Sequence, residues 1–450
     1  MRVLIATAIG TRGLADLRAT EFGRLDESGI TYLDYTGSGL YAESHVRSHA
    51  EFLCRRVLGN PHSGSGPSGL ATEIIANARR DVLDFFHADP DAWTACFTLN
   101  ASAATKLVGE AFPFAPGSRF LLPTDNHNSV NGIREYARSA GADVTYLPID
   151  GELRLGSTDW PAARPGSPSL FAFPAQSNFS GVQHPLELVR RARDAGYRVL
   201  LDAAAFASSN RLALDELQPD FVCVSFYKMF GYPTGVGALL ARREALAELE
   251  RPWFSGGTVE WVTVETARRS LLPDAEAFED GTPNFLDIAA ISPGLDLLAS
   301  VGVDTLHAHA TGLTELLLDR LGSARHSNGH PMVEVYGPPD IESRGGTVAF
   351  NVLDRGGRVR PYEEIERQAR DAGVAIRGGC FCNPGCSEAA FGVDPERALG
   401  CLESVPHGEF HPRRLGDCLD GATVGALRAS VGIASVPRDI DTLMAFLGSR

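Results

Sequence analysis

The sequence predicts an α/β protein in which a mostly parallel sheet is covered by helices on both faces. Strand-like and helix-like segments alternate between about residue 70 and residue 225, the pattern that parallel sheets with crossover helices produce. Small and polar residues follow most of the predicted strands. The chain has 450 residues, of which 44% are hydrophobic, and can therefore bury a large core.

The first part of the chain supplies the elements of this sheet. Residues 72–87 predict an amphipathic helix, because Ile75, Val82 and Phe86 recur at helical spacing between charged residues. Short apolar runs predict strands at residues 95–99, 119–122, 143–147, 169–173, 198–202 and 221–225. Helices are predicted between them at residues 106–112, 133–140 and 185–195.

The pattern changes beyond residue 281. Helices are predicted at residues 288–300, 306–321 and 361–372, with a strand at residues 347–353 and a Gly/Pro/Ser-rich stretch at residues 322–346. We therefore predict a large domain over residues 51–285. Residues 1–50 and 286–450 are predicted to form a second, smaller domain.

Composition excludes several classes of protein. With 56 acidic against 41 basic residues the net charge is −15, and no basic stripe is present, so we expect no nucleic-acid partner. No apolar run approaches the roughly 18 residues of a membrane span, and the apolar start at residues 3–9 is too short to predict a signal peptide. Three of the eight cysteines cluster at Cys380, Cys382 and Cys386, which favours free thiols in a reducing cytoplasm over a disulfide framework.

Polar residues stand at five predicted strand ends. Ligands of open α/β sheets bind outside the carboxyl ends of the strands. We therefore expect one crevice to be lined by residues 100–103, 125–127, 176–178, 202–205 and 225–228.

Lys228 is the candidate nucleophile of this crevice. It follows a buried strand and precedes a turn-rich segment, whereas the chain's one other lysine, Lys106, fits an exposed helical position. Most lysines are solvated surface residues, but this chain uses arginine for nearly all of its positive charge. A desolvated lysine can form a Schiff base, which implies pyridoxal 5′-phosphate as the cofactor.

Neighbouring strand ends carry groups that this cofactor needs. Asp202 is placed to hold the pyridinium nitrogen, although a simple helix cap explains it equally well. Asn100, Ala101 and Ser102 open a helix, whose free N–H groups attract a phosphate, and Ser225 offers a hydroxyl. His127 is a candidate for stacking on the cofactor ring, or else a local hydrogen-bonding residue.

Several long motifs in order resemble the class V aminotransferase superfamily, and within it the cysteine-desulfurase-like domain of molybdenum cofactor sulfurases. They are GNPHS at residues 59–63, PAQSNFSG at 174–181, SFYKMFGYPTG at 225–235, FEDGT at 278–282 and GCFCN at 379–383. The resemblance implies a pyridoxal-phosphate-dependent transferase of fold type I, with a seven-stranded, mostly parallel sheet and a smaller α+β domain.

The resemblance also implies roles for single residues. Lys228 binds the cofactor covalently, Asp202 pairs with the pyridinium and His127 stacks on the ring. Asn178 faces the phenolic oxygen. The phosphate is served by Ser102, Ser225 and Thr258, and because Thr258 is supplied by a neighbouring subunit a homodimer is implied.

On the substrate side, the resemblance implies that Arg428 binds the carboxylate of L-cysteine or a related amino acid, with Asn60 and His62 nearby. Cys382 takes the substrate's sulfur as a persulfide and passes it to a separate acceptor, because the chain ends soon after Arg428 without a molybdopterin-binding domain. An accessible thiolate close to positive charge suits that role, and Arg377 is close in sequence.

Two alternatives stay open. A C–S lyase that performs β-elimination on a cysteine S-conjugate would use Lys228 and Arg428 without Cys382. A zinc-holding scaffold or sulfur-carrier adaptor would instead use the cysteine cluster, although its spacing matches no paired C-x2-C zinc motif. Its candidate ligands are Cys380, Cys382, Cys386, Cys401, His407, His411 and Cys418, and we expect no metal there.

Overall fold

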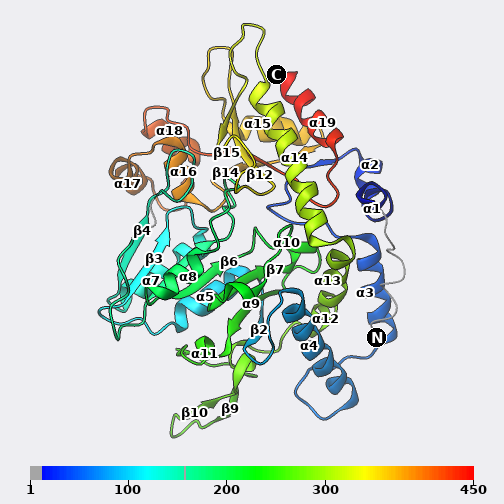
Figure 1. Cartoon of the computed structure of the whole chain (residues 1–450), viewed down its shortest axis with the longest axis vertical. Coiled ribbons are helices and arrows are strands. Elements are labelled where there is room, and N and C mark those ends of the chain that lie inside the picture. Colours follow the sequence, from blue (N-terminus) through cyan, green and yellow to red (C-terminus); the bar gives the residue numbers. More distant parts are fainter. Residues whose placement is uncertain (1–12, 157–158, 450) are drawn as a thin grey trace.

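The structure, a computed structural model, describes residues 13–156 and 159–449. The apolar start at residues 3–9 lies outside the described residues. Figure 1 shows a larger lobe built around a sheet and a smaller lobe above it, with a hairpin projecting from the opposite end. The protein is therefore α/β, as the sequence predicted.

A seven-stranded sheet forms the centre of the larger lobe. Its strand order is β2-β8-β7-β6-β5-β3-β4, and only β8 runs against the others. The strands are β2 (Trp93–Thr98), β3 (Arg119–Pro123), β4 (Asp143–Leu147), β5 (Leu170–Pro174), β6 (Arg198–Asp202), β7 (Phe221–Ser225) and β8 (Gly237–Arg242). The predicted mostly parallel sheet is confirmed, and β8 is the strand that the sequence analysis missed.

Helices cover both faces of this sheet, which explains why most of its strands are continuously apolar. One core packs α4 (Gly66–Phe85), α8 (Leu188–Asp194) and α13 (Ile291–Val301) against one face. A second core packs α5 (Ala101–Ala111) and α7 (Ile133–Ser139) against the other. The shorter helices around them are α6 (Asn128–Asn131), α9 (Leu214–Leu217), α10 (Phe226–Phe230), α11 (Arg243–Leu246), α12 (Phe285–Ile288) and the 3-10 helix η1 (Asp274–Phe278).

The smaller lobe has a four-stranded antiparallel sheet of order β11-β12-β15-β14. Its strands are β11 (Val333–Tyr336), β12 (Thr347–Val352), β14 (Arg377–Gly379) and β15 (Ala426–Ser430), and its main helices are α14 (Val303–Ser323), α15 (Tyr362–Asp371) and α19 (Pro437–Gly448). These helices and strands share one hydrophobic core.

The N-terminal segment packs against this smaller lobe. Strand β1 (Thr31–Tyr32) pairs with β13 (Val374–Ala375), and Arg18 of α1 (Leu14–Glu21) forms an ion pair with Asp439. The helices α2 (Arg24–Ser28) and α3 (Glu43–Arg55) follow. The domain division at residues 50 and 285 stays a prediction, because α13 packs in the core of the large sheet.

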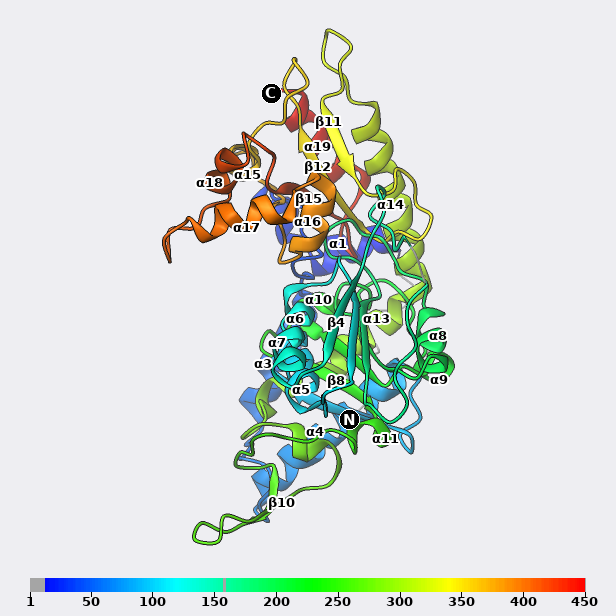
Figure 2. The ribbon, with the colours of Figure 1, turned by 90° about the vertical axis from the view of Figure 1, so that its left-hand side faces the viewer.

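Three further helices lie beside the two lobes (Figure 2): α16 (Pro384–Phe391), α17 (Pro395–Glu403) and α18 (Pro412–Cys418). Cys401 and Cys418 form a disulfide between α17 and α18. The expectation that the cysteines are all free thiols was therefore wrong for this pair. The two helices pack on each other around Cys401, Leu415 and Leu419, so residues that are 17 positions apart become neighbours.

No single helix within residues 13–156 and 159–449 is long and apolar enough to cross a membrane. The helices from Phe285 to Val301 and from Val303 to Ser323 pass such a test only as a joined pair, which is bent by 69°.

Two histidines should make the free energy of unfolding depend on pH. Burial lowers the pKa of His45 of α3 below its ordinary value of 6.5, although its Nε2 contacts the Ala290 carbonyl. Burial also lowers the pKa of His309. The unfolded chain therefore binds more protons than the folded chain as pH falls below 6.5.

We expect the free energy of unfolding to fall as the pH decreases from about 7 to about 5, because protonation of these histidines stabilises the unfolded chain more than the folded chain. Urea unfolding followed by circular dichroism measures this change. The variant His45→Gln should show a shallower dependence than the unaltered chain. A free energy of unfolding that stays constant over this range contradicts the prediction.

Candidate active site

The polar strand ends of the large sheet meet in one pocket, as the sequence predicted. Every one of the five strand ends contributes side chains to it, because the carboxyl ends of the parallel strands lie at one edge. The lining residues are Asn100, Ala101, Ser102, Thr105, His127, Ser129, Pro174, Gln176, Asn178, Asp202, Ala204, Ala205, Ser225, Tyr227 and Lys228.

Lys228 lies in α10, immediately after β7, and is half-buried at the edge of this pocket. Burial lowers the pKa of its ammonium, while the carboxylate of Asp202 acts in the opposite direction. Arg428 and Arg377 add to the lowering. Within the described residues its Nζ has no hydrogen-bond or ion-pair partner. The pocket therefore favours the uncharged amine that a Schiff base requires.

Asp202 and His127 face the same pocket from β6 and from the end of β3. One carboxylate oxygen of Asp202 accepts a hydrogen bond from the Ala204 N–H at 3.0 Å, which fixes the carboxyl group at the strand end. His127 caps α6, where its Nδ1 accepts from the Ser129 N–H at 3.1 Å. Burial lowers the pKa of His127 and so favours its neutral imidazole, although the nearby carboxylate of Asp202 acts in the opposite direction.

The N-terminus of α5 forms one wall of the pocket. Asn100 caps this helix by accepting from the Ala103 N–H at 3.0 Å. The Ser225 hydroxyl accepts from the Ala101 N–H at 2.8 Å. The hydroxyls of Ser102 and Ser129 lie 2.6 Å apart. Helix N–H groups surrounded by hydroxyls form a suitable site for a phosphate group.

These residues fit pyridoxal phosphate. An unpartnered amine, a fixed carboxylate and a helix N-terminus with hydroxyls converge on one pocket, which matches the aldehyde, the pyridinium nitrogen and the phosphate of that cofactor. The individual roles assigned to Asn100, Ala101, Ser102 and Ser225 stay predictions, as do those of Asp202 and Lys228.

Asn178 lines the pocket, and its side-chain amide also binds a neighbouring loop. Its Nδ2 donates to the Phe381 carbonyl at 2.6 Å, and its Oδ1 accepts from Asn383 Nδ2 at 3.0 Å. Both atoms of the amide are thus bound to the loop that carries Cys382. The predicted contact of Asn178 with the phenolic oxygen stays a prediction.

The same loop presents Cys382 beside the pocket. Cys380 and Cys382 are exposed, whereas Cys386 is buried in α16. The Asn128 N–H, next to His127, donates to the Cys382 carbonyl at 2.7 Å and attaches the loop to the large lobe.

Arg428 of β15 is buried under this loop. Its guanidinium donates to the Asn178 carbonyl at 2.8 Å and to Asp34 at 3.0 Å, and it lies 4.7 Å from the centre of the Phe381 ring. Its Nε lacks a hydrogen-bond partner in the part of the chain that the structure describes. Arg377 forms a second ion pair with Asp34. Arg377 is therefore committed to Asp34 rather than to Cys382.

Three predicted site residues lie away from the pocket within one chain. Asn60 donates weakly to the Thr282 hydroxyl at 3.3 Å, and His62 is exposed. The Thr258 hydroxyl donates to the Ser255 carbonyl at 2.9 Å, near the hairpin of β9 (Val259–Val262) and β10 (Arg269–Leu271). The described part of the chain does not bring them to Lys228.

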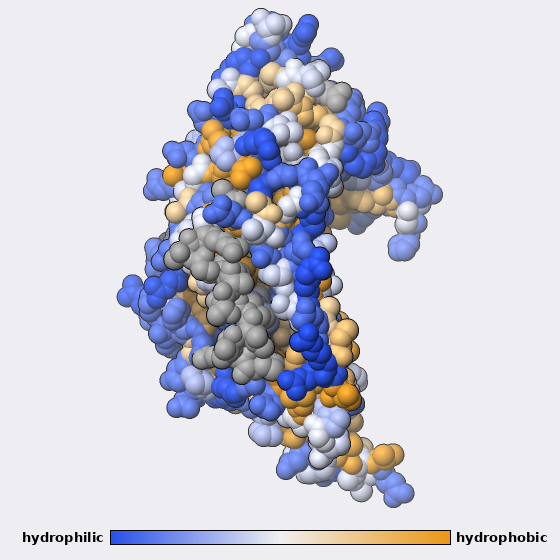
Figure 3. Space-filling model, turned by 90° about the vertical axis from the view of Figure 1, so that its right-hand side faces the viewer, coloured by the Kyte–Doolittle hydropathy of each residue, from blue (hydrophilic) through white to orange (hydrophobic). Residues whose placement is uncertain are grey.

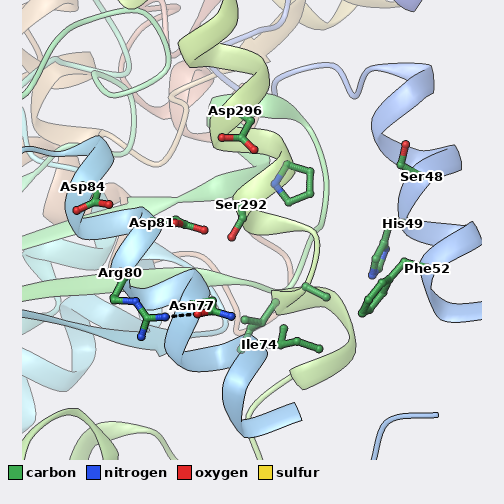
Figure 4. A pocket seen from close by; sticks show the side chains of 13 residues that line it. Ser48, His49, Phe52, Ile74, Asn77, Arg80, Asp81, Asp84, Ser292 and Asp296 are labelled. Atoms are coloured by element: carbon green, nitrogen blue, oxygen red, sulfur yellow. Dashed lines mark hydrogen bonds between the residues drawn. The ribbon is translucent and has the colours of Figure 1, made fainter. Parts of the chain in front are cut away.

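A separate pocket lies between α3, α4 and α13 (Figure 4). Its wall includes Phe52, Ile74 and His49, whose two ring nitrogens contact the Tyr232 hydroxyl and the Leu286 carbonyl. None of the predicted site residues lines it. We therefore place the active site at Lys228. Among the described residues, no group of three or more His, Cys, Asp or Glu side chains is arranged to hold a metal ion.

Sequence reasoning missed three residues of this site. Asp34 holds Arg428 and Arg377, Ser129 supports His127 and Ser102, and Asn383 binds Asn178. One feature of the sequence could have pointed to Asp34, since it is the lone acidic residue in the apolar run from Tyr32 to Tyr35. For Asn383, the sequence offered no feature other than its position next to Cys382.

A lysine-centred pocket at the carboxyl edge of a mostly parallel sheet defines the class of this protein: its fold is that of the pyridoxal-phosphate-dependent transferases of fold type I. Residues 31–443 match the family model "Aminotransferase class-V". The chain therefore belongs to the class V aminotransferase family.

Curated relatives include molybdenum cofactor sulfurases. The Bos taurus protein is 36% identical over 97% of this chain and 52% of its own length, and the Arabidopsis thaliana protein is 35% identical over 97% and 58%. The chain thus spans only slightly more than half the length of these relatives. Among solved structures, a cysteine desulfurase from Thermococcus onnurineus NA1 has a TM-score of 0.81 at 24% identity, covering 98% of both chains. The Escherichia coli cysteine desulfurase CsdA has a TM-score of 0.76 at 21% identity, covering 97% of this chain and 98% of its own.

Proposed function

We propose that the protein is a pyridoxal-phosphate-dependent cysteine desulfurase that takes sulfur from L-cysteine as a persulfide on Cys382 and passes it to a separate acceptor. The observation that carries this proposal is the position of Cys382, exposed on a loop attached beside the Lys228 pocket. The similarity to molybdenum cofactor sulfurases supports it. A cytoplasmic location is part of the same proposal; the six free cysteines favour it, whereas the Cys401–Cys418 disulfide does not.

The cofactor, when bound, would draw electrons from the substrate's carbon skeleton. Arg428 binds the substrate carboxylate with its planar guanidinium, in place of part of its contact with Asp34. The uncharged amine of Lys228 accepts the proton of the α-carbon. Asp202 keeps the pyridinium nitrogen protonated.

Cys382 then acts as the nucleophile. Its thiolate attacks the substrate sulfur, so that an S–S bond forms as the C–S bond breaks and the electron pair of that bond stays with the carbon skeleton. Lys228 returns a proton to the carbon skeleton. The products are alanine and a persulfide on Cys382, so the reaction needs no external oxidant or reductant.

Incubation of the cofactor-loaded protein with L-cysteine tests the proposal. We expect one alanine per sulfur released, and we expect mass spectrometry to find one added sulfur atom on the peptide that contains Cys382. Pyruvate and ammonia in place of alanine would instead assign the protein as a C–S lyase. An unmodified Cys382 peptide would overturn the persulfide route.

We also propose that the working form is a homodimer. Trp253, Trp261 and Val264, on and next to the β9–β10 hairpin, are 57%, 50% and 93% exposed, and Figure 3 shows hydrophobic residues among hydrophilic ones at this lower end of the molecule. A second copy that covers this surface would bring Thr258 toward a neighbouring pocket. Exposed apolar surface of this kind is typical of interfaces.

Light scattering after size-exclusion chromatography tests the dimer. We expect a dimer for the unaltered chain and monomers for Trp261→Glu combined with Val264→Glu. Leu399→Glu is the matched control, because Leu399 is 55% exposed on α17, away from the hairpin. A monomeric unaltered chain would contradict the proposal.

A further inference from the structure

The loop that carries Cys382 is anchored by Asn383, a residue to which the chemistry above gives no role. The Asn383 side chain is fully buried. Its Nδ2 donates to the Asp125 carbonyl at 2.7 Å and to Asn178 Oδ1 at 3.0 Å, while its Oδ1 accepts from the Cys386 N–H at 3.1 Å. Both donor hydrogens of the amide and its oxygen are thus engaged.

Asn178 completes the attachment on the other side of Cys382. Its Nδ2 donates to the Phe381 carbonyl and its Oδ1 accepts from Asn383, so the Asn178 amide contacts the residues immediately before and after the reactive cysteine. We call Asn178 and Asn383 the amide latch. The latch joins three regions of the chain, since Asn178 follows β5, Asp125 follows β3 and Asn383 opens α16.

The loop between these contacts has an unfavourable backbone conformation. Phe381 and Cys382 have φ values of 56° and 57°, in the left-handed region that residues with a side chain seldom occupy. Such conformations persist only where surrounding contacts hold them. Besides the latch, the Asn128 N–H donates to the Cys382 carbonyl and the Phe381 ring packs against Phe179.

We propose that Asn383 is a positioning residue, which together with Asn178 holds the loop in the docked conformation that presents the Cys382 thiol to the Lys228 pocket. The consequence for sulfur transfer rests on the proposed function. The docked conformation itself does not, and it can be measured in the protein without cofactor or substrate.

Amide hydrogen exchange of the full chain tests the latch. Asn383→Asp keeps the oxygen that caps α16 but removes both N–H donors, and Asn383→Ser keeps a capping hydroxyl without adding charge. In cofactor-free protein we expect the peptides that contain Cys382 and Asn128 to exchange at least about tenfold faster in both variants, since two hydrogen bonds are lost.

Asn328→Asp is the matched control. Its Nδ2 donates to the Arg355 carbonyl and its Oδ1 accepts from the His330 N–H, but it lies in an exposed turn of the smaller lobe. We expect no change in exchange at Cys382 in this variant. Unchanged exchange at Cys382 and Asn128 in both Asn383 variants would overturn the proposal. Equal acceleration along the whole of α16 would also overturn it, because Asn383 would then be only a helix cap.

If the proposed desulfurase activity is present, the Asn383 variants should lower kcat about tenfold or more while KM for L-cysteine changes less than about threefold, because Arg428 and Lys228 stay in place. A KM that rises in step with an unchanged kcat would overturn the positioning role. A protein with no desulfurase activity but with the expected exchange pattern would refute the proposed function and leave the latch intact.

Discussion

Lys228→Ala is expected to abolish turnover of L-cysteine, with a loss of at least about 10³-fold, and to remove the visible absorbance of the bound cofactor. Lys228 offers an unpartnered amine within a pocket lined by Asp202 and His127, and its pKa is lowered by burial. An alanine at this position supplies neither a covalent attachment nor a group that moves the α-proton. Absorption spectra and an alanine assay measure the two effects.

The chain offers a close control for this variant. Lys106→Ala replaces the other lysine, which is exposed on α5 and forms an (i, i+4) ion pair with Glu110. Such a pair contributes only a few tenths of a kcal/mol, so activity and stability should stay near those of the unaltered chain. Unchanged turnover in Lys228→Ala, or an equal loss in Lys106→Ala, would show that Lys228 is not the reactive lysine.

The central sheet could be predicted because most of its strands are buried between two layers of helices. Such strands are continuous apolar runs with polar ends, and the predicted strands at residues 198–202 and 221–225 coincide with β6 and β7. The run GALLAR of β8 is rich in alanine and leucine, which favour helices as readily as buried strands. Its place between β2 and β7 is decided by tertiary pairing alone.

The pocket residues could be predicted because each follows a strand of the sheet, and the carboxyl ends of parallel strands lie at the same edge. The residues that hold Arg428 and the Cys382 loop could not. Asp34 and Arg428 are 394 positions apart, and Asn383 lies 205 positions from Asn178. No local pattern records such pairings. The sequence therefore did not indicate that the amide of Asn178 binds the cysteine loop through both of its polar atoms.

Cys382→Ser is expected to retain bound cofactor and to lose sulfur transfer, with alanine formation reduced at least about 10³-fold. A serine hydroxyl matches the thiol in size and keeps the contact of the Cys382 carbonyl with Asn128. It does not ionise near pH 7, however, and it cannot form a persulfide. Spectra with and without L-cysteine should still change on substrate binding, because Lys228 and Arg428 are unaltered.

Two other exposed cysteines provide controls for this variant. Cys54→Ser removes an exposed thiol of α3, and Cys380→Ser removes the exposed thiol two residues before Cys382. Both variants should keep alanine formation within about threefold of the unaltered chain, because Cys54 lies on α3 and the bond from the Asn383 N–H to Cys380 uses the Cys380 carbonyl, which serine retains. Full alanine formation in Cys382→Ser, or its loss in Cys380→Ser, would move the sulfur acceptor away from Cys382 while leaving the Schiff-base chemistry of Lys228 in place.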